Sequence, residues 1–321
     1  MSSADRLPDV TGQVADAVKG NWVDRLAPRW SRPYLRLSRA DRPIGTWLLL
    51  IPCFWGLALA AAQDGWRRWD LWIAAGCAIG AFLMRGAGCT WNDITDRDFD
   101  AQVARTRSRP IPSGQVTARQ ASVWMVVQAV LAALILFSYN RPAILLGVGS
   151  LALVCVYPFA KRFTWWPQVF LGLAFNWGAL LAYAAHAGTI ALPALLAYAA
   201  GISWTLFYDT IYAHQDKDDD ALIGVRSTAR LFGDRTGQWL GVFLVTTVVL
   251  LTAATLAALL PTAGPLQLVL ALAAPWGIGW HLWWQLRHLD TSDPNNCMRL
   301  FRSNRDAGLI AALFLAVAAA L

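Results

Sequence analysis

Two short segments of the chain gather acidic residues beside long apolar runs. The first is Asn92-Asp-Ile-Thr-Asp96-Arg-Asp-Phe-Asp100, and the second is Asp209-Thr-Ile-Tyr212-Ala-His-Gln-Asp216-Lys-Asp-Asp-Asp220. Their polar residues recur at intervals of three and four, which places them on one face of an α-helix. We therefore expect each segment to continue a helix and to present its carboxylates on one side.

Carboxylate and amide oxygens are the ligands that Mg²⁺ prefers in proteins. Like charges one helical turn apart repel each other, so the pattern favours a cation bound between them. A calcium loop beginning at Asp96 is excluded because Ala101 and Arg107 stand where such a loop needs glycine and glutamate. The alternative is a set of solvated loop charges that balance nearby arginines. It accounts for one such cluster more readily than for two.

The elements that carry these segments are predicted to be membrane helices. Of the 321 residues, 57% are hydrophobic and 15% are charged, below the ~25% usual for soluble domains. No Asp, Glu, Lys or Arg occurs in 163–208 or in 236–286, and each run has room for two spans of ~20 residues. This composition excludes disordered and disulfide-scaffold proteins. The nine predicted spans are 44–63, 70–91, 120–140, 143–160, 165–185, 190–212, 237–260, 265–286 and 306–321.

The distribution of basic residues gives the predicted orientation. With a cytoplasmic N-terminus, 24 of the 27 Lys and Arg residues lie on the inner side and three lie outside, which agrees with the positive-inside rule. The arginines cluster beside apolar runs, so the net charge of +7 does not indicate a nucleic-acid partner. The two acidic segments then fall at the inner ends of the second and sixth spans.

Residues 1–42 are predicted to form a basic, interfacial N-terminal segment, followed by one transmembrane domain over 43–321. Within 22–42, Trp22 and Trp30 alternate with six arginines, as in a helix that lies on a membrane surface. No apolar stretch precedes residue 43, and four aspartates interrupt the first 24 residues, so neither a signal peptide nor a transit peptide is indicated. These features favour a multi-pass protein of a bacterial inner membrane.

Cationic residues gather near both acidic segments. They are Arg105, Arg107 and Arg109 after the first, Lys161 and Arg162 at the end of the fourth span, and Arg226 and Arg230 after the second. Carboxylates that hold a metal ion, surrounded by arginine and lysine, are typical of a diphosphate site. In a membrane, the ligand is expected to be a lipid diphosphate with its apolar tail between helices.

The motifs resemble those of the UbiA family of intramembrane prenyltransferases. The two acidic segments match its aspartate-rich motifs, and four further stretches are similar to the branch that prenylates 4-hydroxybenzoate. These stretches are Arg85-Gly-Ala-Gly-Cys-Thr-Trp-Asn92, Arg105-Thr-x-x-Arg109-Pro-x-Pro-Ser-Gly114, Tyr157-Pro-x-x-Lys161-Arg162 and Gly224-Val-Arg-Ser-Thr-Ala229. The resemblance covers residues from about 39 to the C-terminus. Trp91 departs from the pattern, in which a smaller residue is common.

The resemblance implies an all-α fold of nine transmembrane helices around a central cavity. It also implies transfer of a polyprenyl group from polyprenyl diphosphate to 4-hydroxybenzoate, ortho to the hydroxyl, in ubiquinone biosynthesis. Membrane lipid is the expected surrounding, and no obligate protein partner is implied. The implied Mg²⁺ ligands are Asn92, Asp96, Asp100, Asp209, Asp216 and Asp220. The implied substrate-binding residues are Arg85 on the acceptor side and Arg105, Arg109, Tyr157, Lys161, Arg162 and Tyr212 on the diphosphate side, with Asp96, Asp216 and Arg85 as catalytic residues.

Three questions stay open in the sequence. The run Asp218-Asp219-Asp220 does not show which acid completes the second motif. A relative that prenylates another aromatic or tetrapyrrole acceptor would share the acidic motifs, and an ion-coupled transporter would also need acids in a membrane. Transporter sites, however, lie near the midplane on broken helices, whereas these acids are predicted at helix ends. The apolar lining of a tail site does not specify the prenyl chain length.

Overall fold

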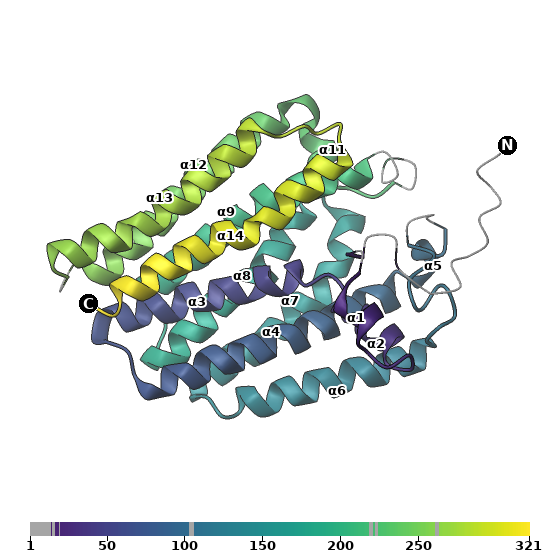
Figure 1. The fold of residues 1–321 in the computed structure, drawn as a ribbon, viewed down its shortest axis with the longest axis horizontal. Coiled ribbons are helices and arrows are strands. Elements are labelled where there is room, and N and C mark those ends of the chain that lie inside the picture. Colours follow the sequence, from purple (N-terminus) through teal and green to yellow (C-terminus); the bar gives the residue numbers. More distant parts are fainter. Residues whose placement is uncertain are drawn as a thin grey trace. The chain divides into compact units, whose positions relative to one another are not determined.

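The computed structural model describes residues 14, 17–18, 20–102, 106–217, 221, 224–260 and 263–321. In these ranges the regular structure is helical throughout, and nine helices have 19 residues or more (Figure 1). The long helices are α3 (Ile44–Asp64), α4 (Arg68–Thr95), α6 (Ala118–Leu136), α7 (Arg141–Phe163), α8 (Pro167–Ala187), α9 (Leu192–Ala213), α12 (Thr236–Leu259), α13 (Pro265–Arg287) and α14 (Pro294–Ala318). The short elements are α1 (Trp22–Arg25), α2 (Arg32–Leu37), α5 (Arg97–Asp100), α11 (Thr228–Phe232) and the 3₁₀ turns η1 (His214–Asp216) and η2 (Gly233–Arg235).

Six stretches of the described chain are long and apolar enough to cross a membrane. They are α3, α4, α6, α7, α8 and the stretch Thr228–Leu259 that contains α12. The chain is therefore a multi-pass, all-helical membrane protein, as the sequence predicts. Helices α9, α13 and α14 have 22, 23 and 25 residues but are not among these six stretches.

The predicted start of the last helix is wrong. The sequence analysis placed it at Asp306, because charges there interrupt the apolar run. Instead α14 begins at Pro294, where the side chain of Asp293 accepts a hydrogen bond from the Asn295 amide. Proline fits the first turn of a helix, since it has no amide to leave unsatisfied there. The helix is 25 residues long, or about 37 Å at ~1.5 Å per residue.

Turn chemistry fixes other helix ends where the sequence indicates. The Asn140 side chain accepts a hydrogen bond from the Ala143 amide at the start of α7. Gly188 follows α8 with φ 74°, a left-handed conformation that glycine adopts without a steric penalty. The predicted break between the spans 165–185 and 190–212 is therefore confirmed.

The chain forms two compact units. Unit 1 contains residues 1–46 and 79–135, and unit 2 contains residues 47–78 and 136–321. In unit 1 the chain after α2 is fastened to α6: Trp124 Nε1 donates to Ser38 Oγ at 2.9 Å, and Ser38 Oγ donates to Gln128 Oε1 at 2.9 Å. Leu37 is fully buried against Val116 and Ala121. Residues 36–41 of the 22–42 segment are thus buried, while the division of that segment from residues 43–321 into separate domains stays a prediction.

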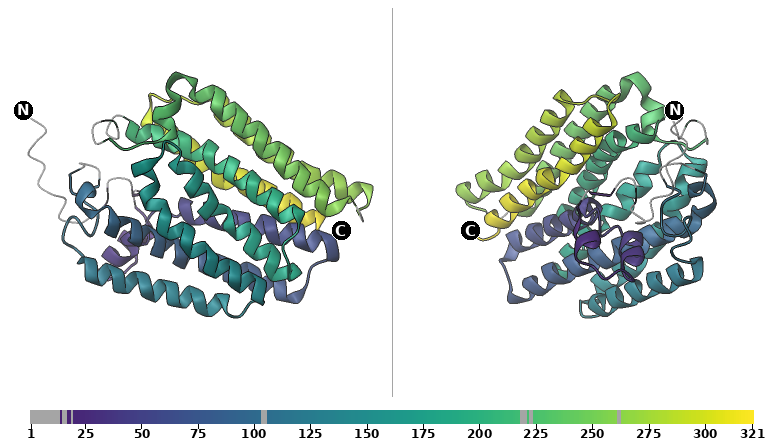
Figure 2. Two further views of the ribbon diagram at one scale, coloured as in Figure 1. Left: turned by 180° about the vertical axis from the view of Figure 1, so that it is seen from behind. Right: turned by 45° about the vertical axis from the view of Figure 1, so that its right-hand side comes forward.

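In unit 2, α9 is packed against α8, α12 and α14 (Figure 2). Trp204 of α9 is fully buried and donates from Nε1 to Asn304 Oδ1 on α14 at 2.9 Å. Asn304 also donates from Nδ2 to Gln285 Oε1 on α13 at 3.0 Å. A buried polar network whose members all have partners makes the packing of these three helices specific.

The turn between α3 and α4 is tied to the end of α8, within unit 2. His186 Nδ1 lies 2.7 Å from Asp70 Oδ1, and its Nε2 lies 2.6 Å from Asp64 Oδ1. Arg67 forms an ion pair with Asp64 and donates to the His186 carbonyl. These contacts account for the charged residues of this turn without a ligand.

Candidate active site

The first aspartate-rich motif lies at the end of α4 in unit 1. Asn92 and Asp93 belong to α4, Asp96 separates α4 from α5, and Asp100 ends α5. At Asp96 the backbone has φ −101° and ψ 5°, outside the helical region. The predicted continuous helix is therefore wrong at this point. The amide-to-carbonyl ladder nevertheless passes through the break, from Asp96 to Asn92 at 2.9 Å and from Asp100 to Asp96 at 2.8 Å.

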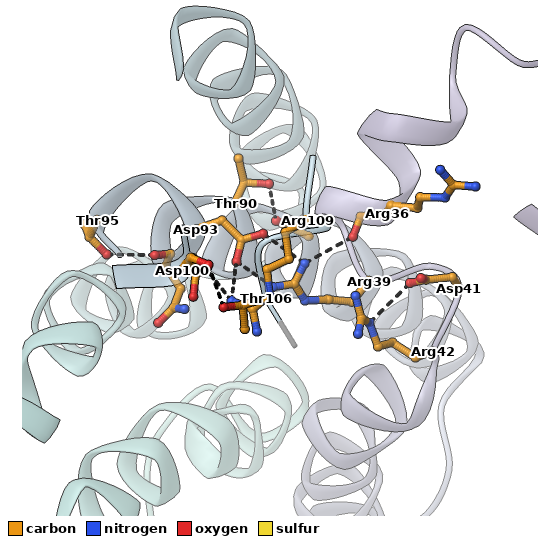
Figure 3. Close-up of polar contacts among 12 residues, drawn as sticks. Arg36, Arg39, Asp41, Arg42, Thr90, Asp93, Thr95, Asp100, Thr106 and Arg109 are labelled. Atoms are coloured by element: carbon orange, nitrogen blue, oxygen red, sulfur yellow. Dashed lines mark hydrogen bonds and ion pairs between the residues drawn. The ribbon is translucent and has the colours of Figure 1, made fainter. Parts of the chain in front are cut away.

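An ion-pair network occupies this motif (Figure 3). Arg39 donates two hydrogen bonds to Asp93, from Nη2 to Oδ1 at 2.5 Å and from Nη1 to Oδ2 at 2.9 Å. Asp93 is fully buried, and the side chain of Arg39 is 8% exposed. Burial by itself would lower the pKa of Arg39, but the Asp93 carboxylate raises it, so the Arg39 guanidinium group stays charged.

Arg109 connects two carboxylates of the motif. Its Nη1 donates to Asp100 Oδ2 at 2.8 Å and to Asp93 Oδ1 at 3.3 Å. Burial raises the pKa of Asp100, and Arg109 opposes that shift. Thr106 donates from its hydroxyl to the Asp100 carbonyl at 2.9 Å, which holds the chain that leads to Arg109.

Arg39 and Asp93 belong to the site, although neither is among the site residues that the sequence predicts. Arg39 was one of six arginines assigned to an interfacial segment, and it is buried instead. It is also the one described non-glycine residue with positive φ, 56°. Asp93 was read as part of the motif but given no role. The two residues are 54 positions apart, so no local spacing shows their pairing.

Asp41 is another buried acid in the same unit. Its carboxylate is 1% exposed, and Arg42 Nε lies 3.4 Å from Oδ1. Neither oxygen has a hydrogen-bond partner elsewhere in the described part of unit 1. Burial raises the pKa of Asp41 to about 6, although Arg39 opposes this shift.

Arg85 lies on α4, two turns before Asn92 and half-buried. Its guanidinium group covers Gly45 in the first turn of α3. The predicted placement of Arg85 on the same helix as the motif is confirmed by the bounds of α4.

The second motif lies at the end of α9 in unit 2. Asp209 and Tyr212 are half-buried residues of α9, and Asp216 ends the 3₁₀ turn η1 that follows. The expected α-helical continuation is wrong after Ala213, because the helix tightens there. The Tyr212 ring packs on Phe301 of α14 at 4.6 Å between centroids. Asp218, Asp219 and Asp220, like Arg105 near the first motif, lie outside the described residues.

A neutral histidine adjoins this motif. His214 is buried, its Nε2 lies 3.1 Å from Thr236 Oγ1, and burial together with Lys217 lowers its pKa to about 4. Thr210 in turn pairs with Thr228 at 2.7 Å. These contacts fasten the start of α11 and α12 to the end of α9.

The end of α7 carries the other predicted diphosphate residues. Tyr157 and Lys161 are half-buried there, and the exposed Arg162 lies over the Phe159 ring at 5.0 Å. Arg226 donates its amide to the Lys161 carbonyl at 3.3 Å and its guanidinium to the Phe163 carbonyl at 2.8 Å. Arg226 therefore closes the C-terminal end of α7.

The donor chemistry of the two motifs fits Mg²⁺. Asn92, Asp96 and Asp100 offer amide and carboxylate oxygens from one helix end, and Asp209 and Asp216 offer carboxylates from another. Among the described residues, no group of three or more Asp, Glu, His or Cys side chains is placed to hold a metal ion.

Unit 2 also contains an apolar cavity of about 900 Å³ between α3, α4 and α14. Aliphatic and aromatic side chains line most of it, including Phe54, Leu57 and Leu313. Arg67 and Asp306 add charged groups. An apolar space of this size is suited to a hydrocarbon chain.

The fold defines a multi-pass helical membrane protein, and comparison with known proteins narrows this class. The sequence profile of the UbiA prenyltransferase family matches residues 49–319. The chain therefore belongs to the UbiA prenyltransferase family. This confirms the resemblance that the aspartate-rich motifs indicate.

Three relatives carry the same name, "4-hydroxybenzoate polyprenyltransferase, mitochondrial". The protein of Rattus norvegicus is 47% identical over 295 residues, which cover 91% of this chain and 75% of that protein. The Homo sapiens protein is 47% identical, with coverages of 88% and 74%. The Arabidopsis thaliana protein is 45% identical, with coverages of 91% and 70%.

Two solved structures have a similar fold. The UbiA homolog of Aeropyrum pernix K1 superposes with a TM-score of 0.64 and 22% identity, over 84% of this chain and 97% of that one. The homolog of Archaeoglobus fulgidus, described as bound to DMAPP and Mg²⁺, gives a TM-score of 0.65 and 20% identity, over 89% and 97%. At this identity the likeness concerns the fold alone.

Proposed function

We propose that the chain is a 4-hydroxybenzoate polyprenyltransferase of ubiquinone biosynthesis. The observation that carries this proposal is the 45–48% identity, over about nine-tenths of the chain, with proteins of that name. The aspartate-rich motifs alone would not distinguish this acceptor from others. The extent of the identity favours the same acceptor.

The reaction breaks the bond between C1 of the polyprenyl chain and the diphosphate oxygen, which keeps the electron pair. A ring carbon of 4-hydroxybenzoate, ortho to the hydroxyl, then forms a bond to C1 and loses its proton. The products are 3-polyprenyl-4-hydroxybenzoate, diphosphate and a proton. Because the allylic cation formed on the way reacts with water, the chain must supply a dry cavity.

The residues divide among these tasks. Asn92, Asp96 and Asp100, with Asp209, Asp216 and Asp220, would hold Mg²⁺ ions, which stabilise negative charge on the departing diphosphate when bound. Arg105, Arg109, Lys161 and Arg162, with the hydroxyls of Tyr157 and Tyr212, bind the diphosphate oxygens. Arg109 already lies one hydrogen bond from Asp100, so a cation for the diphosphate adjoins a carboxylate for the metal. Asp96 and Asp216 are the carboxylates assigned to catalysis.

Arg85 is assigned to the acceptor. The carboxylate of 4-hydroxybenzoate does not react, and in a dry pocket it needs a fixed cation. A guanidinium group binds a carboxylate through two parallel hydrogen bonds, which also orients the ring. The apolar cavity of unit 2 is assigned to the polyprenyl tail.

The proposal includes nine transmembrane helices around a central cavity and a cytoplasmic N-terminus. The nine long helices and the distribution of Lys and Arg support it. For the compartment, the sequence favours a bacterial inner membrane, whereas the relatives compared above are named as mitochondrial. Localisation of the tagged chain in its own cells decides between the two.

Product analysis tests the proposal directly. Membranes that contain the protein are supplied with polyprenyl diphosphates of mixed length, Mg²⁺ and several aromatic acceptors, and the products are identified by mass spectrometry. We expect 3-polyprenyl-4-hydroxybenzoate, and none without Mg²⁺. Prenylation of a different acceptor in preference to 4-hydroxybenzoate would refute the proposed substrate.

Substitution of single aspartates tests the assigned roles. We expect Asp96→Asn and Asp216→Asn each to lower turnover by orders of magnitude while the protein remains folded. Asp98→Asn is the matched control, since Asp98 belongs to the same segment but its side chain is 84% exposed. Equal activity in all three variants would contradict the assignment.

A further inference from the structure

Gly45, in the first turn of α3, lies directly beneath the guanidinium group of Arg85. A Cβ atom placed on Gly45 would lie 2.5 Å from Arg85 Nε, 2.6 Å from Nη2 and 2.7 Å from Cζ. Ordinary contacts between carbon and such atoms are about 3.5–4.0 Å. The guanidinium group can therefore occupy this place only because residue 45 has no side chain.

The glycine at position 45 has a steric explanation. Gly45 has no positive φ, so its backbone does not require glycine. The contact with Arg85 is the steric reason that the structure offers.

The chain just before Gly45 is anchored to α4 and α6. Arg39 holds Asp93 of α4 with two hydrogen bonds, and Ser38 is bonded to Gln128 and Trp124 of α6. A Cβ on Gly86, next to Arg85, would meet Ser38 at 2.9 Å, so this segment lies close against α4. The backbone at Gly45 is therefore held in place, and the flexible end of Arg85 is the part that yields to a new side chain.

We propose that Gly45 is a positioning residue for the aromatic acceptor: it leaves the space that sets the place of the Arg85 guanidinium group. The inference rests on the acceptor role of Arg85 in the proposed function. Alanine at residue 45 would displace the guanidinium group by about 1 Å, from 2.5 Å to an ordinary contact. A displacement of this size in a substrate-positioning group can lower a rate by about a hundredfold.

The test measures selectivity between 4-hydroxybenzoate and its uncharged analogue 4-hydroxybenzamide. In Gly45→Ala we expect kcat/KM for 4-hydroxybenzoate to fall about 10- to 100-fold. We expect kcat/KM for the amide, and KM for the polyprenyl diphosphate, to change little. Gly80→Ala is the matched control on α4, because a Cβ there meets no atom within 4 Å.

Two further variants make the result decisive. In the Arg85→Ala background, Gly45→Ala should produce no additional loss of selectivity, because the group that it displaces is absent. A loss that persists in this background, or unchanged selectivity in folded Gly45→Ala, would overturn the proposal. Unchanged selectivity in Arg85→Ala itself would overturn the acceptor role of Arg85, and the inference with it. The product made by the wild type tests the proposed reaction separately.

Discussion

Replacing Asp93 by asparagine keeps the shape of the side chain and removes the charge at the centre of the unit 1 network. Arg39 bonds to Asp93 at 2.5 and 2.9 Å, and Arg109 approaches it at 3.3 Å. Asp93 is fully shielded from solvent, and the two arginine side chains are 8% and 12% exposed. The substitution therefore leaves cationic charge buried without its counter-ion.

Removal of one partner from a buried ion pair lowers the free energy of unfolding by about 3–5 kcal/mol. The lower half of this range applies here, since the asparagine oxygen still accepts one hydrogen bond and Arg109 keeps Asp100. With ~2–4 °C per kcal/mol for a large domain, we expect the melting temperature to fall by roughly 6–16 °C. Thermal unfolding of the detergent-solubilised protein, followed by cysteine accessibility, measures this shift.

The control and the refuting result come from the same motif. Asp98 pairs only with Arg97 among the described residues, and their side chains are 84% and 54% exposed. Exposed pairs contribute ~0–1 kcal/mol, so Asp98→Asn should shift the melting temperature by at most a few degrees. If Asp93→Asn were as stable as Asp98→Asn, the network would not contribute to stability as reasoned.

Three other predictions concern the rest of the chain. Burial raises the pKa of Asp41 to about 6 from an unfolded value near 3.9, so ionisation of Asp41 lowers the free energy of unfolding as pH rises from about 4 to 6. We expect Asp41→Asn to remove this pH dependence and to stabilise the protein at pH 8 by up to ~3 kcal/mol. An unchanged pH profile of unfolding in the variant would contradict this reasoning. A Cβ on Gly56 would lie 2.0 Å from the Ala179 carbonyl oxygen, whereas one on Gly241 meets nothing within 4 Å, so Gly56→Ala should lower the melting temperature strongly and Gly241→Ala should not. Reporter fusions after Arg119 and Arg235 should both indicate the cytoplasm, and opposite signals would refute the predicted topology.

Much of the fold can be predicted because a helix that crosses lipid needs a long run of apolar residues without charges. Charge-free runs with turn residues between them locate α8 and α12 to within two residues of their observed bounds. The start of α14 could not be located in this way. Its N-terminal half carries Arg299, Arg302 and Arg305, which interrupt the apolar pattern although they follow one exposed face of a helix whose other face is buried.

The residues of the site also differ in how far the sequence predicts them. The aspartates of each motif can be identified because they recur at regular spacing within a dozen residues. The pairing of Asp93 with Arg39 cannot, since Arg39 is 54 residues away and has a left-handed backbone that no residue pattern indicates. The contact between Gly45 and Arg85 depends on the absence of a Cβ atom at residue 45. A single sequence does not distinguish Gly45 from the other glycines, of which the chain has 24 in all.

The length of α14 has a consequence for the lipid around it. After the exposed pair Arg305–Asp306, which is joined at 2.8 Å, only the 12 residues 307–318 of α14 precede the C-cap Ala319. This apolar part spans about 18 Å, against a hydrocarbon core of ~30 Å. A bilayer adapts to such a mismatch by thinning locally and by letting long side chains snorkel to the headgroups. Since Asp306 also lines the apolar cavity of unit 2, lipid headgroups should reach the level of that cavity beside α14.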